Sequence, residues 1–170
     1  SRHMCRFFVF LCFFWCFVGG FAPVSHAQSV SNSAPTFLDD EAEENVNVSF
    51  TLEKLGNFAP NPPAATPSAR LLFDYQDANN FYSLELRGHS VAFVLTRDAK
   101  RTLLSRAAFA PSAKNALVLQ RRTWLMQLLV NDQVVLRAFD ATWNEGQIGS
   151  SFPASSGLKA TDFRVQPTED

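Results

Sequence analysis

The sequence predicts an all-β protein built as an antiparallel β-sandwich. Apolar residues alternate with polar ones at Val46, Val48, Phe50 and Leu52, the period of a strand that buries one face. Residues that favour turns recur at short, regular spacing along the rest of the chain. No apolar run with helical spacing follows residue 28, so two packed sheets are the expected architecture.

About ten short strands are expected along the chain, a number typical of sandwiches and barrels. They span residues 46–52, 71–75, 81–86, 91–96, 102–108, 116–120, 124–130, 134–139, 147–152 and 162–165. The longest connection, residues 56–68, contains four prolines, which have no N–H group to give to a β-ladder. Residues 131–133 include Asn and Asp, which tolerate the left-handed backbone of tight hairpin turns.

Residues 1–27 have the layout of a cleavable signal peptide. Arg2 and Arg6 give a positively charged region before an apolar run over residues 7–21, and Ser25-His26-Ala27 places small residues where a signal peptidase cuts. A transmembrane anchor is the alternative, but the run is about fifteen residues long and a bilayer needs roughly 20. The protein is therefore expected to be secreted, periplasmic or on the cell surface, with membrane contact only through an uncleaved signal segment.

Three segments follow from this reading. Residues 1–3 precede Met4 and are interpreted as an expression or translation remnant of the signal segment. Residues 28–45 form a flexible acidic lead, and residues 46–170 form the β-sandwich domain. The chain's three cysteines all lie before residue 17, so the mature chain forms no disulfide. A formal net charge of -1 offers no basic stripe for nucleic acid, which excludes that class of partner.

Short motifs in the second part of the chain resemble a known pattern. Residues 74–82 match the hairpin F-x-Y-x-D-x-x-N-F/Y-Y, and residues 115–140 match the double hairpin N-x-L-x-V-x-x-x-G…V-N-G-x-x-V. Residues 146–149 and 161–165 match the closing motifs G-x-I-G and D-D-F-R-V. Together they are similar to the concanavalin A-like lectin/glucanase (laminin G-like) domains of bacterial exported proteins, over about residues 46 to 166.

This resemblance implies a jelly-roll sandwich whose concave sheet often binds glycans. Some relatives are fused to enzymes or act as adhesion modules, and a related group hydrolyses keto-disaccharides. Residues 37–40 look like the family's opening F-x-D-D-F, but the tryptophan-bearing hairpins expected after them are missing, so the N-terminal part is expected to be shortened. Thr123 and Asp132 stand where the family usually has turn glycines.

The expected strand over residues 81–86, with its flanking residues Asn80 and Arg87, begins in the best-matched motif and supplies the candidate glycan-binding face. Successive side chains of a strand point to opposite faces, so Tyr82 shares an apolar face with its alternate neighbours, while Glu85 and Arg87 share the other. The second face mixes donors and acceptors, as sugar-binding surfaces do. The candidate ligand-binding residues are Asn80, Tyr82, Glu85, Arg87 and Arg97.

Aromatic side chains offer a second kind of sugar contact. Tyr82, Trp124 and Trp143 each present a ring face with a polar tip, which suits stacking on sugar rings and equally suits packing at the edge of a core. Glu85 and Arg87 likewise have an alternative, an ion pair at the surface. His89 is the only histidine after residue 27 and is expected in an exposed turn.

Calcium is the one cofactor that the sequence suggests. Asp39 or Asp40 together with Asp162 would join the opening and closing strands, and calcium prefers such oxygen ligands. The oxygen-rich residues 77–80 form a second possible calcium or sugar site, although such residues more often close their own turn. The chain cannot supply a usual zinc ligand set.

Three functions remain open. The first is a non-catalytic exported module that binds glycan or another surface polymer. The second is a hydrolase of the keto-disaccharide hydrolase-like kind, or its accessory domain, although the chain lacks the Glu-x-Asp-x-x-Glu strand of glucanases and shows no catalytic residues. The third is a structural or protein-interaction module, which a sheet face filled by side chains would favour.

Overall fold

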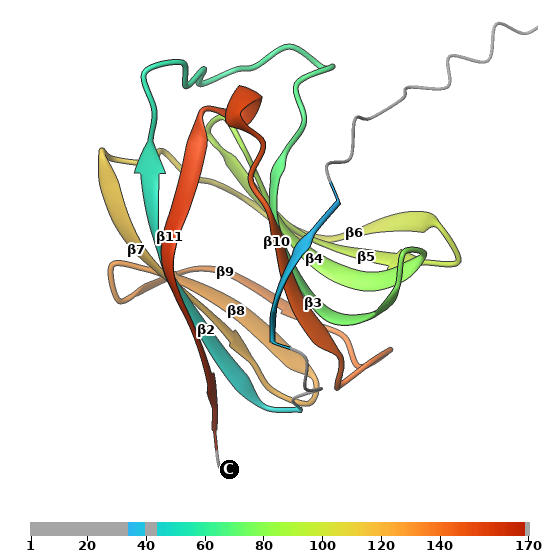
Figure 1. Cartoon of the computed structure of the whole chain (residues 1–170). Helices are drawn as coiled ribbons and strands as arrows, with labels where there is room; N and C mark the ends of the chain where they lie inside the picture. Colours follow the sequence, from blue (N-terminus) through green and yellow to red (C-terminus); the bar gives the residue numbers. More distant parts are fainter. Residues whose placement is uncertain (1–33, 40–43, 169–170) are drawn as a thin grey trace, which may run out of the picture.

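Two antiparallel sheets pack face to face in the computed structural model, which describes residues 34–39 and 44–168 (Figure 1). The six-stranded sheet has the order β1-β10-β3-β4-β5-β6, and the five-stranded sheet has the order β11-β2-β7-β8-β9. The strands are β1 (Thr36–Asp39), β2 (Val46–Lys54), β3 (Ala69–Asp77), β4 (Asn80–Arg87), β5 (Ser90–Arg97), β6 (Lys100–Ala108), β7 (Lys114–Arg121), β8 (Leu125–Val130), β9 (Gln133–Phe139), β10 (Gln147–Ser151) and β11 (Leu158–Pro167). This arrangement confirms the all-β, jelly-roll sandwich that the sequence predicts.

The core lies between the two sheets and is built by alternate residues of each strand. Val48 and Leu52 of β2 are fully buried, and so are Leu84 and Leu86 of β4. All four belong to one apolar cluster that both sheets share. Each such side chain contributes roughly 1.5–3 kcal/mol by leaving water, so the period-two pattern that predicts the strands also provides much of their stability.

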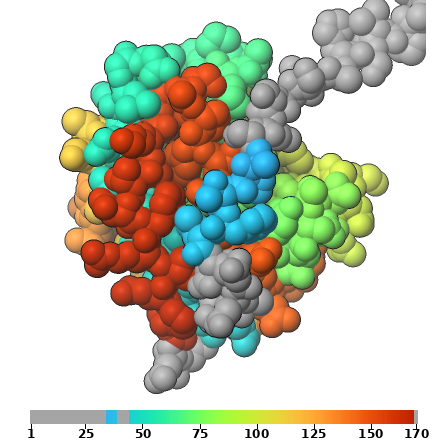
Figure 2. Space-filling view, viewed as in Figure 1, coloured from blue at the N-terminus to red at the C-terminus, as the bar shows by residue number. Residues whose placement is uncertain are grey.

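β1 is a strand that the sequence does not predict. Thr36–Asp39 belong to the segment expected to be a flexible lead, yet Phe37 pairs with Gly149 of β10 at the edge of the six-stranded sheet. A Cβ at Gly149 would lie 3.3 Å from the Phe37 ring, so the glycine lets the ring approach the backbone closely. The residues of β1 lie at the surface against the C-terminal strands (blue against red in Figure 2). Their pairing with β10 is what makes these residues a strand.

β11 begins at Leu158, earlier than the predicted strand over residues 162–165. Its first half pairs with the end of β2, where Leu158 lies opposite Lys54. Asp162 has a positive φ of 58°, and the register shifts between Thr161 and Arg164. Such a bulge interrupts the alternation of faces, which explains why the sequence shows only the second half as a strand.

The position of Arg121 also differs from the sequence-based expectation. The sequence places it in a polar connection with Arg122 and Thr123, but it is the last residue of β7 and is fully buried at one end of the core. Its guanidinium lies 5.2 Å from the centre of the Tyr82 ring and donates to the backbone carbonyl of Trp143. Because these contacts come from β4 and from the connection between β9 and β10, the sequence around Arg121 does not reveal them.

The membrane-related expectations concern a part of the chain that lies outside the described residues. The signal peptide over residues 1–27, and residues 28–33 and 40–43 of the lead, are not among the residues that the structure describes. Within the described ranges, no helix has the length and apolar character needed to cross a membrane. Cleavage after Ala27 and export therefore stay predictions.

Candidate ligand-binding pocket on the six-stranded sheet

An open pocket of about 600 Å³ lies on the outer face of the six-stranded sheet. Its floor comes from β4, β5 and β6, and one wall comes from the proline-rich loop between β2 and β3, which Figure 1 shows arching over one end of the sandwich. We call this cavity the sheet pocket. It is lined by Glu85, Arg87, Ser90, Ala92, Arg101 and Arg106 of the strands, His89 of the β4–β5 turn, and Pro60, Asn61, Pro62, Ala64 and Ser68 at the loop side.

The pocket has depth because the middle strand carries small side chains there. In the strand register, Ala92 of β5 lies between Glu85 of β4 and Arg106 of β6, and Ser90 lies beside Arg87. Long polar side chains on β4 and β6 therefore flank short ones on β5. Glu85 and Arg87 of β4 point outward, and so do Ser90 and Ala92 of β5, because alternate residues of a strand share a face.

Arg101 and Arg106 reach the same face through a β-bulge in β6. They are five residues apart, an odd spacing that would place them on opposite faces of a regular strand. The register shifts between Phe93 and Val94 of β5, whose partners are Ser105 and Leu103. This extra residue in β6 restores both arginines to the outer face, which is the usual effect of a bulge.

The loop wall is attached to the β4–β5 turn by hydrogen bonds. The backbone N–H of His89 donates to the carbonyl of Pro60 at 2.8 Å, and the Arg87 guanidinium donates to the carbonyls of Pro62 and Pro63. Gly88, with φ of +53°, leaves room for this contact, since a Cβ there would lie 2.1 Å from the Pro60 oxygen. The loop and the turn thus form one unit at the pocket rim.

Glu85 is held by its neighbours on the pocket floor. Its carboxylate accepts a hydrogen bond from Ser83 at 3.0 Å and pairs with Arg101 at 2.6 Å. The Glu85 side chain is only 12% exposed, whereas that of Arg101 is 57% exposed. Burial lowers the pKa of Arg70, the β3 neighbour of Glu85, against the opposing effect of the Glu85 charge. Glu85 therefore holds Arg101 against the pocket floor.

The structure brings two of the five candidate ligand-binding residues together in the sheet pocket, Glu85 and Arg87. Asn80 and Arg97 lie at the other end of β4 and β5, roughly 20 Å away along strands of this length. The Asn80 side chain donates to Asp77 and accepts from the backbone N–H of Asp98, so it joins two turns.

Tyr82 faces the core and is fully buried, which removes it from any ligand surface. Its hydroxyl contacts the carboxylate of Asp140 and accepts from the backbone N–H of Thr142 at 3.0 Å. Burial, together with the Asp140 contact, raises the pKa of Tyr82 to about 12. The apolar face that the sequence predicts for this strand is confirmed, and Tyr82 belongs to it.

Arg101, Arg106, Ser90, Ala92 and the loop residues of the pocket are absent from the sequence-based candidates. Ser90 and Ala92 alternate on the strand after Glu85 and Arg87, so a predicted hairpin register would have found them. The two arginines of β6 carry no such signal, because the bulge changes their face.

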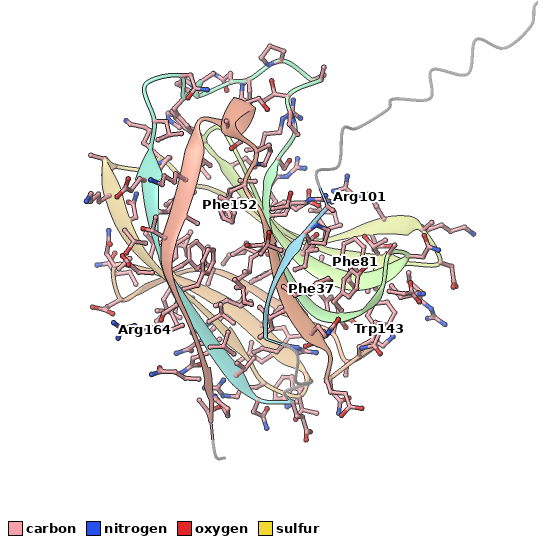
Figure 3. All side chains as sticks on the ribbon, in the orientation of Figure 1. Phe37, Phe81, Arg101, Trp143, Phe152 and Arg164 are labelled. Carbon is pink, nitrogen blue, oxygen red and sulfur yellow. The ribbon has the colours of Figure 1, made fainter. Side chains whose placement is uncertain are left out.

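The other aromatic candidates lie outside the pocket. Trp124 and Phe139 stack at 5.3 Å on the five-stranded sheet, and both are more than half exposed. Trp143 packs edge-on against Tyr82 at 5.5 Å. Phe37 and Phe81, labelled in Figure 3, each contact Tyr75 on the outer side of the six-stranded sheet, at 5.0 and 5.7 Å. This second group shares a sheet face with the pocket.

Only part of the expected calcium site lies within the residues that the structure describes. Asp40 lies outside the described residues, and Asp39 ends β1, which pairs with β10, whereas β11 with Asp162 pairs with β2. Among the residues that the structure describes, no group of three metal-ligating side chains comes together. Calcium binding therefore stays a prediction.

Residues 77–80 close their own turn, which is the structural alternative considered for them. Asp77 accepts hydrogen bonds from the backbone N–H of Asn79 at 2.7 Å and from the Asn80 side chain at 3.0 Å. These bonds, that from the Asn80 side chain first, lower the pKa of Asp77. His89 is exposed in its turn, as expected, and also lines the sheet pocket.

Comparison with known proteins gives likeness in structure alone. No protein-family model and no curated protein sequence matches the chain. The carbohydrate-binding module CBM66 from Bacillus subtilis is 13% identical with a TM-score of 0.57, and the match covers 75% of this chain and 78% of that one. Galectin LEC-6 from Caenorhabditis elegans is 10% identical with a TM-score of 0.60, and the match covers 79% of this chain and 92% of that one. Sheep galectin-11 is 11% identical with a TM-score of 0.56, and the match covers 80% of this chain and 100% of that one. At these identities the likeness shows the jelly-roll, lectin-like fold.

Proposed function

We propose that this chain is a non-catalytic, exported β-sandwich module that binds a glycan or another surface polymer in the sheet pocket. The observation that carries the proposal is the pocket itself, an open cavity of about 600 Å³ lined by guanidinium, hydroxyl and imidazole groups. Glycans present many hydroxyls, and such side chains are suited to fix their orientation. Export rests on the signal-peptide layout of residues 1–27.

The likeness to solved structures supports the same reading. A carbohydrate-binding module and two galectins share the fold over most of this chain. Because one fold hosts many functions, the sheet pocket supports binding more directly than the shared fold does.

Binding fits the pocket better than hydrolysis does. Glycoside hydrolysis uses two carboxyl groups on either side of the scissile bond. Among the residues that line the pocket, Glu85 is the only carboxylate, and it is already paired with Arg101. A sheet face filled by side chains would favour a protein-interaction module. The face over β4 to β6 instead contains an open pocket, which favours ligand binding.

A glycan array with the mature chain tests the proposal. We expect weak binding to a subset of glycans, and we expect Ser90→Trp to abolish it, because the new ring would occupy the pocket beside Arg87. Trp124→Ala is the matched control, since that exposed indole lies on the other sheet and its loss should leave binding unchanged. Melting temperatures of both variants check that they remain folded.

Three results would contradict the proposal. A blank array would argue against a glycan as the ligand. Loss of binding with Trp124→Ala but not with Ser90→Trp would place the ligand outside the sheet pocket. Release of new reducing ends from a bound polymer during incubation would instead favour the hydrolase alternative.

A further inference from the structure

The sheet pocket carries an excess of positive charge that the rest of the chain does not share. Arg87, Arg101 and Arg106 line it, and Glu85 is the only acidic side chain in the lining. The chain as a whole has a formal net charge of -1. Positive charge is thus concentrated in a cavity, where it attracts an oppositely charged ligand most effectively.

Glu85, the single carboxylate of the pocket, neutralises only part of this positive charge. Glu85 is paired with Arg101 and is mostly buried, with Ser83 on its other oxygen. Arg70 lies beside it on β3, close enough for the Glu85 charge to affect its pKa. Glu85 is therefore surrounded by positive groups and acts as a positioning residue for Arg101.

The other two arginines keep unused hydrogen-bonding capacity. Arg106 has no hydrogen-bond or ion-pair partner among the described residues, and it is exposed at the pocket edge. Arg87 donates to two loop carbonyls through its Nη2 atom, and its Nε is buried and has no partner in the described part of the chain. A guanidinium presents donors in a planar fork that matches the paired oxygens of a carboxylate or a sulfate.

We propose that the ligand of the sheet pocket is an anionic glycan, one whose sugars carry carboxylate or sulfate groups held by Arg87, Arg101 and Arg106. This inference rests on the proposed function and narrows it to a class of glycan. The β6 bulge supports it, because it brings both Arg101 and Arg106 to the ligand face. Ser90 and Ala92 leave room between the arginines for the sugar rings.

The test compares polymers that differ only in charge. Dextran sulfate is compared with dextran for the sulfate source, and polygalacturonate is compared with its methyl ester for the carboxylate source. We expect at least one charged polymer to bind about tenfold or more tightly than its neutral match, by affinity electrophoresis or titration calorimetry. We also expect this binding to weaken as NaCl rises from about 50 to about 300 mM, because salt screens exposed charges.

Variants locate the binding. Arg106→Gln should weaken binding of the charged polymer about tenfold, and Arg106→Lys, which keeps the charge but loses the fork, should fall between it and the wild type. Arg164→Gln is the matched control, because Arg164 is an exposed arginine of β11 in the five-stranded sheet (Figure 3). It removes the same charge far from the pocket and should leave binding unchanged.

Each contrary outcome has its own meaning. Equal affinity for charged and neutral polymers would overturn the anionic class while leaving glycan binding in place. An equal loss with Arg106→Gln and Arg164→Gln would show attraction by overall charge and overturn the pocket as its site. Binding to none of the charged or neutral polymers or array glycans would overturn both this inference and the proposed function.

Discussion

Asp74 and Arg121 form a buried ion pair at one end of the core, with the Arg121 Nε 2.8 Å from the Asp74 Oδ2. The Asp74 side chain is 2% exposed and that of Arg121 is not exposed at all. Asp74 adopts a positive φ of 46° in β3, while Arg121 ends β7, so the pair links the two sheets. Removing charges from water is costly, and such a pair is kept only where both partners are well bonded.

The pair makes stability depend on pH. Burial raises the pKa of Asp74 to about 6 from the usual 3.8, with the Arg121 charge opposing the rise. The folded state therefore holds a proton between about pH 4 and 6 that the unfolded state releases. The stability gained from this proton is fully present below about pH 4 and is lost as the pH rises through about 6.

The Asp74→Asn variant isolates this effect. We expect the unfolding free energy of the wild type, relative to the variant, to fall by on the order of 2–3 kcal/mol between pH 4 and 7. Asn tolerates the positive φ at this position, so the backbone should be retained. Urea titrations at several pH values measure the difference. A constant difference would show that Asp74 titrates as an ordinary carboxyl group, and a wild type that gains stability relative to the variant as the pH rises would show a lowered pKa; either result would contradict this account.

Removal of Arg121 should be strongly destabilising. Arg121→Met leaves the Asp74 carboxylate buried and unpaired, which typically costs about 3–5 kcal/mol. The double variant with Asp74→Asn should lose less, because no charge remains unpaired. Denaturant titration at pH 7.5 compares the two. If the single and double variants were equally unstable, the pair would contribute nothing beyond the packing of the Arg121 side chain.

The contact between the proline-rich loop and the β4–β5 turn depends on Gly88. We expect Gly88→Ala to lower the unfolding free energy by about 1–3 kcal/mol, because a Cβ there would clash with Pro60 and φ is positive. Glycan binding should weaken as well, since the loop forms one wall of the sheet pocket. Gly56→Ala is the matched control, with nothing within 4 Å of the added Cβ. Equal effects of the two substitutions would contradict this account.

Processing should leave Gln28 as the first residue of the exported protein. The prediction follows from Ser25-His26-Ala27 after the apolar run. Intact-mass measurement of the protein recovered outside the cytoplasm checks it. A mature chain that retains residues 7–21 would instead support the membrane-anchor alternative.

Calcium, if bound by Asp39 or Asp40 with Asp162, should raise the melting temperature. A ligand that binds only the folded state stabilises it by mass action. Thermal melts in millimolar calcium, then with excess chelator, measure the shift, and Asp162→Asn should remove it. An unchanged melting temperature in the wild type would rule out calcium as a stabilising cofactor.

Much of the strand pattern could be predicted because each strand buries one face. The alternation of Val48 and Leu52 in β2, and of Leu84 and Leu86 in β4, predicts both the strand and the side that faces the core. The same alternation places Glu85 and Arg87 on the outer face, which the sheet pocket confirms. β1 escaped prediction because four residues show too little alternation, and its pairing with β10 decides it.

By itself the sequence determined the fold class, most strands and the outward direction of Glu85 and Arg87, since these follow from local periodicity. Only the tertiary structure decided which other residues join them. A one-residue bulge in β6 brings Arg101 and Arg106 to one face, and a distant loop is held against Gly88. Arg121 is polar in sequence but buried in the fold, because its partner Asp74 comes from the opposite sheet. Contacts between residues far apart in the chain leave no periodic trace, so the pocket and the ion pair exist only once the sheets have packed.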